Sequence, residues 1–308
     1  MAIVSRTTQN MLTRRALINI NRAERRVLDL QEQLATGQRV NRPSDDPLAA
    51  RRAIDARAEV RKNEQYLANI SSARPYLQET ETTLLTTTNI LQRAYELTLQ
   101  GANDTNSQVD RNQIAIEINQ ILENTLVEAN HKTGNRYIFG GTWTASPPYT
   151  AIRNAAGEIT SIVYNGNNET IEAEISPVVR VPVNETGNGY FWDTDFTSAN
   201  VFETLISIRD NLRAGNTAAL TQDLRNLQSN LDRVTTALAR VGAIQNRMDL
   251  IQNATEIYNV QLESLRSESV DADFADVTVN LNVALNALQG ALNVGARVLQ
   301  PTLLDFIR

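Results

Sequence analysis

The C-terminal segment 270–300 carries apolar side chains at two positions of a seven-residue repeat, and this repeat constrains the fold more than any other feature. Phe274, Leu281, Leu288 and Gly295 hold one position, Val270, Val277, Ala284, Ala291 and Val298 hold the other, and Leu285, Leu292 and Leu299 lie beside them. Burying one Leu or Val side chain stabilises a fold by about 1.5–3 kcal/mol, so such a stripe is not left in water. The segment is therefore predicted to be a helix with a partner.

The N-terminal segment offers a matching stripe. Ile20, Val27 and Leu34 repeat every seven residues, and Gly37 follows as a helix stop. We therefore predict that the two ends of the chain pair as a coiled coil. The polar side of the C-terminal helix carries almost no charge, whereas a face turned to water normally carries charged residues. We infer that the terminal coiled coil becomes buried in an assembly of several chains.

The 20 residues from Val277 to Ala296 contain no charged side chain, a length that could span a membrane. Five amide side chains argue against membrane insertion, because each would lie in hydrocarbon. They are Asn280, Asn282, Asn286, Gln289 and Asn293. The segment MAIVSRTTQNMLTRR also lacks an apolar run of seven residues, so we expect no cleavable signal peptide.

The middle of the chain differs in composition from both ends. Between Gly134 and Phe202 lie ten of the 16 aromatic residues, seven of the 13 glycines and four of the eight prolines. Strands are predicted at 149–153, 158–164, 171–175 and 178–181, separated by turns that include Asn165-Gly166, a good hairpin signal. We predict a small inserted antiparallel β domain, with a core that contains Trp143, Tyr190, Phe191 and Trp192.

The remaining segments have helical spacing and identifiable ends. Asp46 can cap a helix that starts at Pro47 and runs towards Gly101, with a kink or interruption expected at Pro75. Helices are also predicted after Ser107, near 202–212, and over about fifty residues after Gly215-Asn216. The predicted fold is mainly α, a long antiparallel helical bundle with a coiled coil formed by both chain ends and a small inserted antiparallel β domain.

The composition disfavours catalysis. The chain has no cysteine and a single histidine, His131, which excludes thiolate chemistry and most imidazole metal sites. Asp45-Asp46 is interpreted as a loop and cap, and Asp271, Asp273 and Asp276 lack the further ligands and the turning glycine of a calcium loop. We therefore predict no enzyme activity and no catalytic, cofactor-binding or metal-binding residue.

Charge is distributed unevenly along the chain. Residues 1–62 contain 13 Lys and Arg against seven Asp and Glu, whereas residues 63–308 contain 16 against 28. A basic segment can bind nucleic acid, but acids interrupt this one and no aromatic residue accompanies it. We expect no nucleic-acid partner. A coiled-coil protein that binds nucleic acid or a membrane surface remains as a remote alternative.

At four places the sequence resembles the flagellin family of axial bacterial flagellar proteins. These segments are LATGQRVN (34–41) followed by SDDP (44–47), GANDTNSQ (101–108), DADFA (271–275) and LLDF (303–306). Two further segments, NRPSDDPLAA (41–50) and GNRYIFGG (134–141), resemble the hook-filament junction members of the family more than the flagellins. A filament-forming flagellin remains the alternative within the family.

The resemblance implies a structural adaptor in the extracellular bacterial flagellum. Its implied partners are a ring of copies of itself, hook-associated protein 1 on one side, flagellin on the other, and a cytoplasmic export chaperone that holds the C-terminal helix. Export would follow the flagellar type III route without a cleavable signal. The resemblance also implies chain ends that are disordered in the monomer and fold on assembly.

These inferences give a predicted division of the chain. Residues 1–46 and 270–308 form the inner terminal coil, 47–133 and 201–269 the helical shell, and 134–200 the inserted β domain. Residues of the two terminal stripes are predicted to make the assembly contacts. They are Ile20, Val27, Leu34, Phe274, Val277, Leu281, Leu285, Leu288, Leu292, Leu299 and Phe306.

Overall fold

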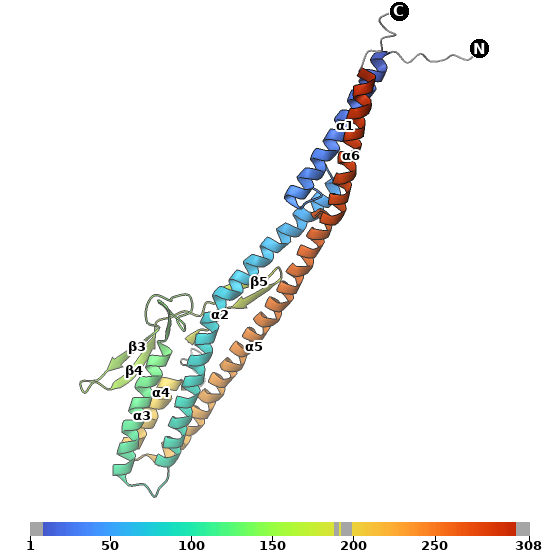
Figure 1. Cartoon of the computed structure of the whole chain (residues 1–308). Coiled ribbons are helices and arrows are strands. Elements are labelled where there is room, and N and C mark those ends of the chain that lie inside the picture. The colour runs from blue at the N-terminus through green and yellow to red at the C-terminus, as the bar shows by residue number, and fades with distance from the viewer. Residues whose placement is uncertain (1–8, 188–190, 192–198, 300–308) are drawn as a thin grey trace, which may run out of the picture. The chain divides into compact units, whose positions relative to one another are not determined.

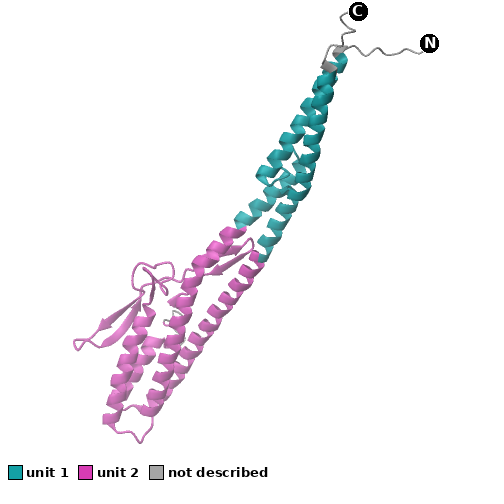
Figure 2. Ribbon diagram, viewed as in Figure 1, with its two compact units in different colours: residues 1–62, 257–308 teal, residues 63–256 magenta. Residues whose placement is uncertain are grey.

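The computed structural model describes residues 9–187, residue 191 and residues 199–299. The chain forms two compact units (Figures 1 and 2). Unit 1 contains residues 1–62 and 257–308, and unit 2 contains residues 63–256. The boundaries between the two units, after Lys62 and before Ile257, do not coincide with any of the predicted divisions. The assignment of segments to an inner coil and an outer shell of an assembly stays a prediction.

Unit 1 is built on the helices from the two ends of the chain. Helices α1 (Gln9–Thr36) and α6 (Phe274–Leu299) lie side by side and run in opposite directions (Figure 1). The start of α2 (Pro47–Gly101) and the end of α5 (Thr217–Val270) complete the unit. The predicted pairing of the terminal segments is therefore confirmed as a feature of the fold.

Unit 2 is a bundle in which α3 (Gln108–Ala129) and α4 (Val201–Ala214) pack with the remaining parts of α2 and α5. Capping boxes define the starts of the two short helices, at Ser107 for α3 and at Asn200 for α4. Gly215 ends α4 in the left-handed conformation at φ 67°, which a glycine adopts without steric cost. The predicted helical bundle is confirmed.

Of the kink or interruption expected at Pro75, the interruption does not occur: α2 continues through this residue for 55 residues in all. A proline inside a helix leaves the carbonyl four residues earlier, here that of Ser71, without its hydrogen-bond donor. Both Pro75 and Ser71 are exposed. Water can therefore satisfy this carbonyl, and the helix tolerates the proline on its outer face.

The described residues of the middle region form three separate two-stranded antiparallel sheets. Their strands are β1 (Lys132–Thr133) with β2 (Arg136–Tyr137), β3 (Tyr149–Arg153) with β4 (Ile159–Tyr164), and β5 (Glu172–Ser176) with β6 (Val179–Pro182). The hairpin expected at Asn165-Gly166 does not form, because the chain after β4 bonds to an earlier loop. Asn167 donates from its backbone N–H to the Gly140 carbonyl at 3.2 Å, and its side-chain oxygen accepts from the Thr142 N–H at 2.8 Å.

Aromatic residues form the core beside these sheets, but not all of those predicted. The ring centroids of Phe139 and Phe191 lie 5.2 Å apart, and those of Tyr149 and Phe202 lie 5.3 Å apart. The prediction for Phe191 is confirmed, whereas Trp143 is 61% exposed and does not belong to the core. Tyr190 and Trp192 lie outside the described residues.

Candidate assembly surface

The seam between α1 and α6 buries the middle of both predicted stripes. Val27 on α1 and Val277 and Ala284 on α6 each expose 6% or less of their surface. Near the far end of α6, a Cβ built on Gly295 would lie 2.9 Å from the Ile20 Cδ1 atom. The glycine therefore lets the two helices approach closely, as small residues on the stripe predicted.

The rest of the α6 stripe stays partly or largely exposed. Leu281 and Leu288 are half-buried, but Phe274 is 65% exposed, Leu285 42% and Leu292 50%. Leu299 is the last residue of α6, and Phe306 lies outside the described residues. Of the predicted assembly residues on α1, Val27 is buried and Ile20 and Leu34 are half-buried. The predicted set therefore contains an inward group that holds the two helices together and an outward group.

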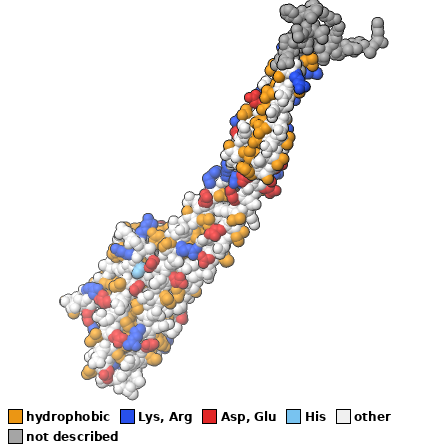
Figure 3. Space-filling view, in the orientation of Figure 1, with side chains coloured by type: hydrophobic (Ala, Val, Ile, Leu, Met, Phe, Trp, Pro, Cys, Tyr) orange, Lys and Arg blue, Asp and Glu red, His pale blue; other side chains and the backbone are white. Residues whose placement is uncertain are grey.

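Further large apolar side chains are exposed along unit 1, which Figure 3 shows as orange surface between polar side chains. They are Met11, Leu12, Leu17, Ile18, Leu28, Leu48, Ile54, Ile257, Tyr258, Val260, Leu265, Val279, Val283 and Val294. The helices of unit 1 do not bury these apolar groups among themselves, and extended apolar surface marks an interaction site. The arrangement can make protein contacts along its length.

Hydrogen bonds that the sequence patterns did not predict hold together the place where the loop after α1 meets the connection between α5 and α6. Gly37 adopts φ 70°, and its carbonyl accepts from the Ala272 N–H at 2.9 Å. The Arg39 N–H donates to the Val270 carbonyl at 2.7 Å, and the Arg39 guanidinium donates to the Ser269 carbonyl at 2.8 Å. These bonds join the first loop to the α5–α6 connection and set where the terminal helices meet.

The carboxylate pair Asp45-Asp46 belongs to this loop and has a structural role. Asp45 accepts hydrogen bonds from the backbone N–H groups of Asn41 and Arg42 at 3.1 and 2.8 Å. Asp46 accepts from the Ala49 N–H at 3.1 Å, which caps α2, and this bond lowers the pKa of Asp46 below its ordinary value. Both carboxylates are therefore occupied in holding the loop and the helix start.

The other acidic candidates are also used locally. Asp271 pairs with Arg266 at 3.2 Å, and Asp273 accepts from the N–H groups of Ala275 and Asp276 at the start of α6. His131 lies 3.3 Å from Glu79. Among the described residues, no three acidic or histidine side chains are grouped as metal ligands would be. In the same ranges, no helix has both the length and the mean hydropathy that a membrane span needs.

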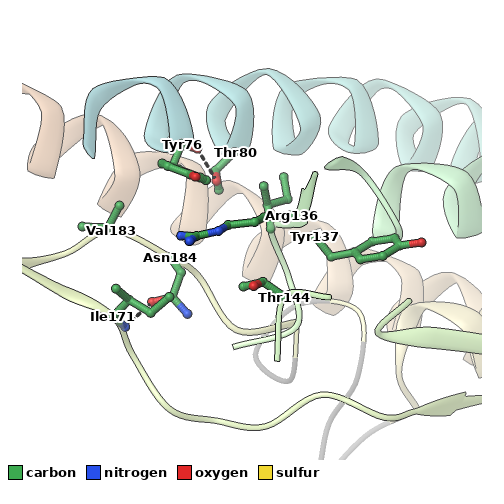
Figure 4. Close-up of a pocket in the computed structure, with 9 residues that line it drawn as sticks. Tyr76, Thr80, Arg136, Tyr137, Thr144, Ile171, Val183 and Asn184 are labelled. Atoms are coloured by element: carbon green, nitrogen blue, oxygen red, sulfur yellow. Dashed lines mark hydrogen bonds between the residues drawn. The ribbon is translucent and has the colours of Figure 1, made fainter. Parts of the chain in front are cut away.

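A small cavity in unit 2 holds about 70 Å³ and has mostly apolar walls. Figure 4 shows its side chains, with Arg136 extending between Tyr76 and Asn184. Thr80, at the edge, donates its hydroxyl to the Tyr76 carbonyl at 2.7 Å and is bonded within its own helix. The cavity has neither a nucleophile paired with a base nor a pair of free carboxylates, so its lining supports no catalytic mechanism.

Comparisons with known proteins agree with this geometry. Residues 8–144 match the family model described as bacterial flagellin N-terminal helical region. The chain is 25% identical to flagellar hook-associated protein 3 of Escherichia coli (strain K12), over 93% of this chain and 94% of that protein. It is also 25% identical to the flagellar filament 30.7 kDa core protein of Treponema maltophilum, over 81% of this chain and 80% of that protein.

A solved structure shares the fold. The flagellar junction protein FlgL from Legionella pneumophila aligns with a TM-score of 0.62 at 17% identity, over 71% of this chain and all of that one. The family match, the near full-length relative and the shared fold agree with the sequence motifs. The chain is therefore similar to the flagellin family through residues 8–144 and, over nearly its whole length, to flagellar hook-associated protein 3.

Proposed function

We propose that the chain is a structural adaptor that joins the flagellar hook to the flagellin filament. The observation that carries this proposal is the near full-length likeness to hook-associated protein 3, which includes the middle region as well as both terminal segments. The filament core protein of Treponema maltophilum matches over a smaller share of both chains. This difference favours the junction role over that of a filament-forming flagellin.

The architecture of unit 1 supports a role in assembly. The terminal helices bury their inward residues in each other and leave Phe274, Leu285 and Leu292 exposed for contacts with other subunits. In this proposal, residues 1–36 and 270–300 form an inner tube wall, residues 47–131 and 216–268 a helical shell around it, and residues 134–200 an outer domain. Copies of the chain form a ring, with hook-associated protein 1 on one side and flagellin on the other.

The proposal also covers events before assembly. The chain is exported outside the cell by the flagellar type III apparatus. A cytoplasmic chaperone covers the apolar stripe of α6 until export, because those exposed side chains would otherwise associate. In the proposed role the chain has no enzyme activity and needs no cofactor, since the side chains described above serve packing and capping.

Deletion of the gene tests the proposal. Cells without it are expected to keep hooks, lose filaments and release flagellin into the medium, as seen by electron microscopy and by immunoblotting of the supernatant. A plasmid copy of the gene should restore filaments. Normal filaments on the deletion strain would overturn the junction role. Loss of flagellin itself, with no monomer in the medium, would instead support a filament-forming flagellin.

A further inference from the structure

Helix α5 has an exposed side in unit 2 that carries no charge and turns away from α2. With about 100° of rotation per residue, this side is separated from Gln245 and Gln252, whose side chains bond to α2. Leu250 lies at its centre and exposes 71% of its surface. A helix side turned to water normally carries charged residues, so this one indicates a protein contact. Its exposed residues are Ala243, Asn246, Leu250, Asn253 and Ala254.

Helix α2 has an exposed side of similar character. It turns away from α5, and Arg74 is the only charged side chain between positions 65 and 78. The Arg74 guanidinium is bonded to α5, with 2.6 Å to the Asp249 carboxylate. The exposed side is therefore uncharged and mostly small, and another helix can approach it closely. Its residues are Ala68, Ser71, Pro75 and Gln78.

Each of these two sides also carries a polar group that lacks a partner. Pro75 has no N–H, so the carbonyl of Ser71 lacks its helical donor, and both residues are exposed. Asn253 is exposed, and its amide makes no side-chain hydrogen bond with the residues that the structure describes. A side-chain amide is a donor that such a carbonyl can accept. The α2 side thus offers an acceptor and the α5 side a donor.

Hydrogen bonds within the chain show which residues of α2 and α5 lie at the same level. Arg74 donates to Asp249 at 2.6 Å and to Gln252 at 2.7 Å, and Glu81 accepts from Gln245 at 2.9 Å. A later residue of α2 therefore meets an earlier residue of α5, so these helices, side by side in Figure 1, are antiparallel. The residues at matching levels are Ser71 with Asn253, Pro75 with Leu250, and Gln78 with Asn246.

We propose that the uncharged side of α5 packs on the uncharged side of α2 in a second copy of the chain. Leu250 lies against Pro75 of the neighbour, and the Asn253 amide donates to the carbonyl of the neighbour's Ser71. The contact is heterologous, because the two sides are different surfaces, so each copy contacts one neighbour through α5 and another through α2. Contacts of this kind close into a ring when the rotation between copies allows it.

The contact fits the layers of the proposed assembly. Both surfaces belong to residues 47–131 and 216–268, which form the helical shell in that assembly. Copies in a ring are related by rotation about its axis, so with α2 and α5 parallel to this axis, residues at one level meet. The inference rests on the proposed function, because it names the contact between neighbouring subunits of the same ring.

Disulfide cross-linking tests the contact, since the chain has no cysteine of its own. Two copies of the gene with different epitope tags, one with S71C and the other with N253C, are expressed together in the deletion strain. Oxidation of isolated flagella is expected to give a dimer that carries both tags on a non-reducing gel. Each chain has one cysteine, so this dimer must join two copies. A dimer with only one of the tags, or no dimer, would overturn the proposal.

Matched pairs on the same two surfaces test the register. Q78C with N246C is expected to link as well as S71C with N253C. The crossed pairs, S71C with N246C and Q78C with N253C, are displaced by seven residues, or about 10 Å along a helix. A disulfide needs Cα atoms within about 7 Å, so the crossed pairs should stay unlinked. Crossed pairs that link as efficiently would contradict the register and overturn the proposal.

A charge on the α5 surface supplies a readout that needs no cysteine. L250D is expected to reduce the number of filaments per cell by about tenfold or more. It should leave the circular dichroism of the monomer unchanged, because the side chain is exposed in the single chain. The control is I116D, the same change at a residue of α3 that is 60% exposed and lies outside the proposed contact. Normal filaments with L250D, or an equal loss with I116D, would overturn the proposal.

Failure of the junction role is recognised separately, because the deletion strain then keeps its filaments. If the deletion strain lacks filaments but S71C and N253C do not link in flagella of the complemented strain, only the inference fails.

Discussion

At the scale of single residues, buried threonines are prominent in the core of unit 2. Thr87 and Thr98 donate their hydroxyls to the backbone carbonyls four residues earlier, at 2.8 and 2.7 Å, so their polar groups are satisfied inside the helix. Thr83 is 1% exposed, and its hydroxyl has no hydrogen-bond partner among the residues that the structure describes. A buried hydroxyl without a partner lowers the stability of the fold.

Replacement of Thr83 by Val is therefore expected to raise the free energy of unfolding by about 1 kcal/mol, because a methyl group takes the place of the unpaired hydroxyl. The measurement is the urea midpoint followed by far-UV circular dichroism. Thr87→Val is the matched control, since it removes a satisfied hydroxyl and should gain less. A lower midpoint for Thr83→Val than for Thr87→Val would contradict this account.

The ion pair between Glu158 and Arg213 links the β3–β4 turn to α4. Both Arg213 Nη atoms donate to the carboxylate, at 2.6 and 3.0 Å. These bonds lower the pKa of Glu158 from 4.5 to about 2, against the opposing effect of desolvation. A lowered pKa means that the folded state holds the proton less tightly than the unfolded state, so stability falls as the pH falls from about 4.5 to about 2.

The thermal unfolding midpoint is therefore expected to decrease over this pH range, and Glu158→Gln should make the decrease smaller. Glu172→Gln is the control, because that exposed carboxyl has no described cationic partner and its change should leave the pH profile intact. Equal profiles for wild type and Glu158→Gln would show that the pair contributes nothing to acid sensitivity.

At the scale of elements, the apolar stripe of α6 has two groups of residues with different roles. Val277 and Ala284 face α1 and are buried, whereas Leu285 and Leu292 lie on the flank and remain exposed. The seven-residue repeat placed the first group correctly. The repeat could not distinguish a side chain that packs within its own chain from one that stays exposed and can contact another chain, because both are apolar and lie on one face of the helix.

The two groups are expected to respond differently to a charge. L285D/L292D should keep the helical content and solubility of the monomer but block assembly, because both side chains are exposed in the single chain, at 42% and 50% of their surface. Val277→Asp should lower the helical content, because it leaves an unpaired charge in the seam. Circular dichroism of the monomer and filament counts in a complemented deletion strain measure the two effects. Loss of helix in L285D/L292D would contradict the assignment.

At the scale of the whole molecule, the apolar core is unevenly shared between the units. One large cluster of buried residues extends through unit 2, whereas the cluster of unit 1 consists of Val40, Ala49, Ala53 and Val270. Local opening is easiest where few apolar contacts hold the elements together. Unit 1 is therefore the less stable part of the isolated chain.

Brief proteolysis of the monomer is expected to trim both ends before it cuts unit 2. Two proteases of different specificity are needed, because the arginines of α1 and α2 favour trypsin in any case. Mass spectrometry should show a persistent fragment close to residues 63–256, and assembled flagella should protect the ends. Ends as resistant as the middle in the monomer would contradict folding coupled to assembly.

Much of this fold follows from local sequence patterns. The repeat along 270–300, the cap and proline at Asp46-Pro47, and the alternation in 149–164 each specify their element through interactions between near neighbours in the chain. Family motifs added the flagellar assignment. One local signal misled: Asn165-Gly166 does not form a hairpin, because Asn167 bonds to a distant loop instead. At Pro75, where a kink or an interruption is expected, α2 is not interrupted, because the exposed position lets water bond the carbonyl that lacks a donor.

The sequence by itself determined that the chain is helical at both ends, that those ends pair, and that the β region lies between them, because periodicity and turn chemistry act over a few residues. Only the tertiary structure decided which stripe residues stay exposed, that Arg213 pairs with Glu158, and how Arg39 ties the first loop to Val270. Exposure and charge pairing depend on residues brought together from distant parts of the chain, so no local pattern contains them.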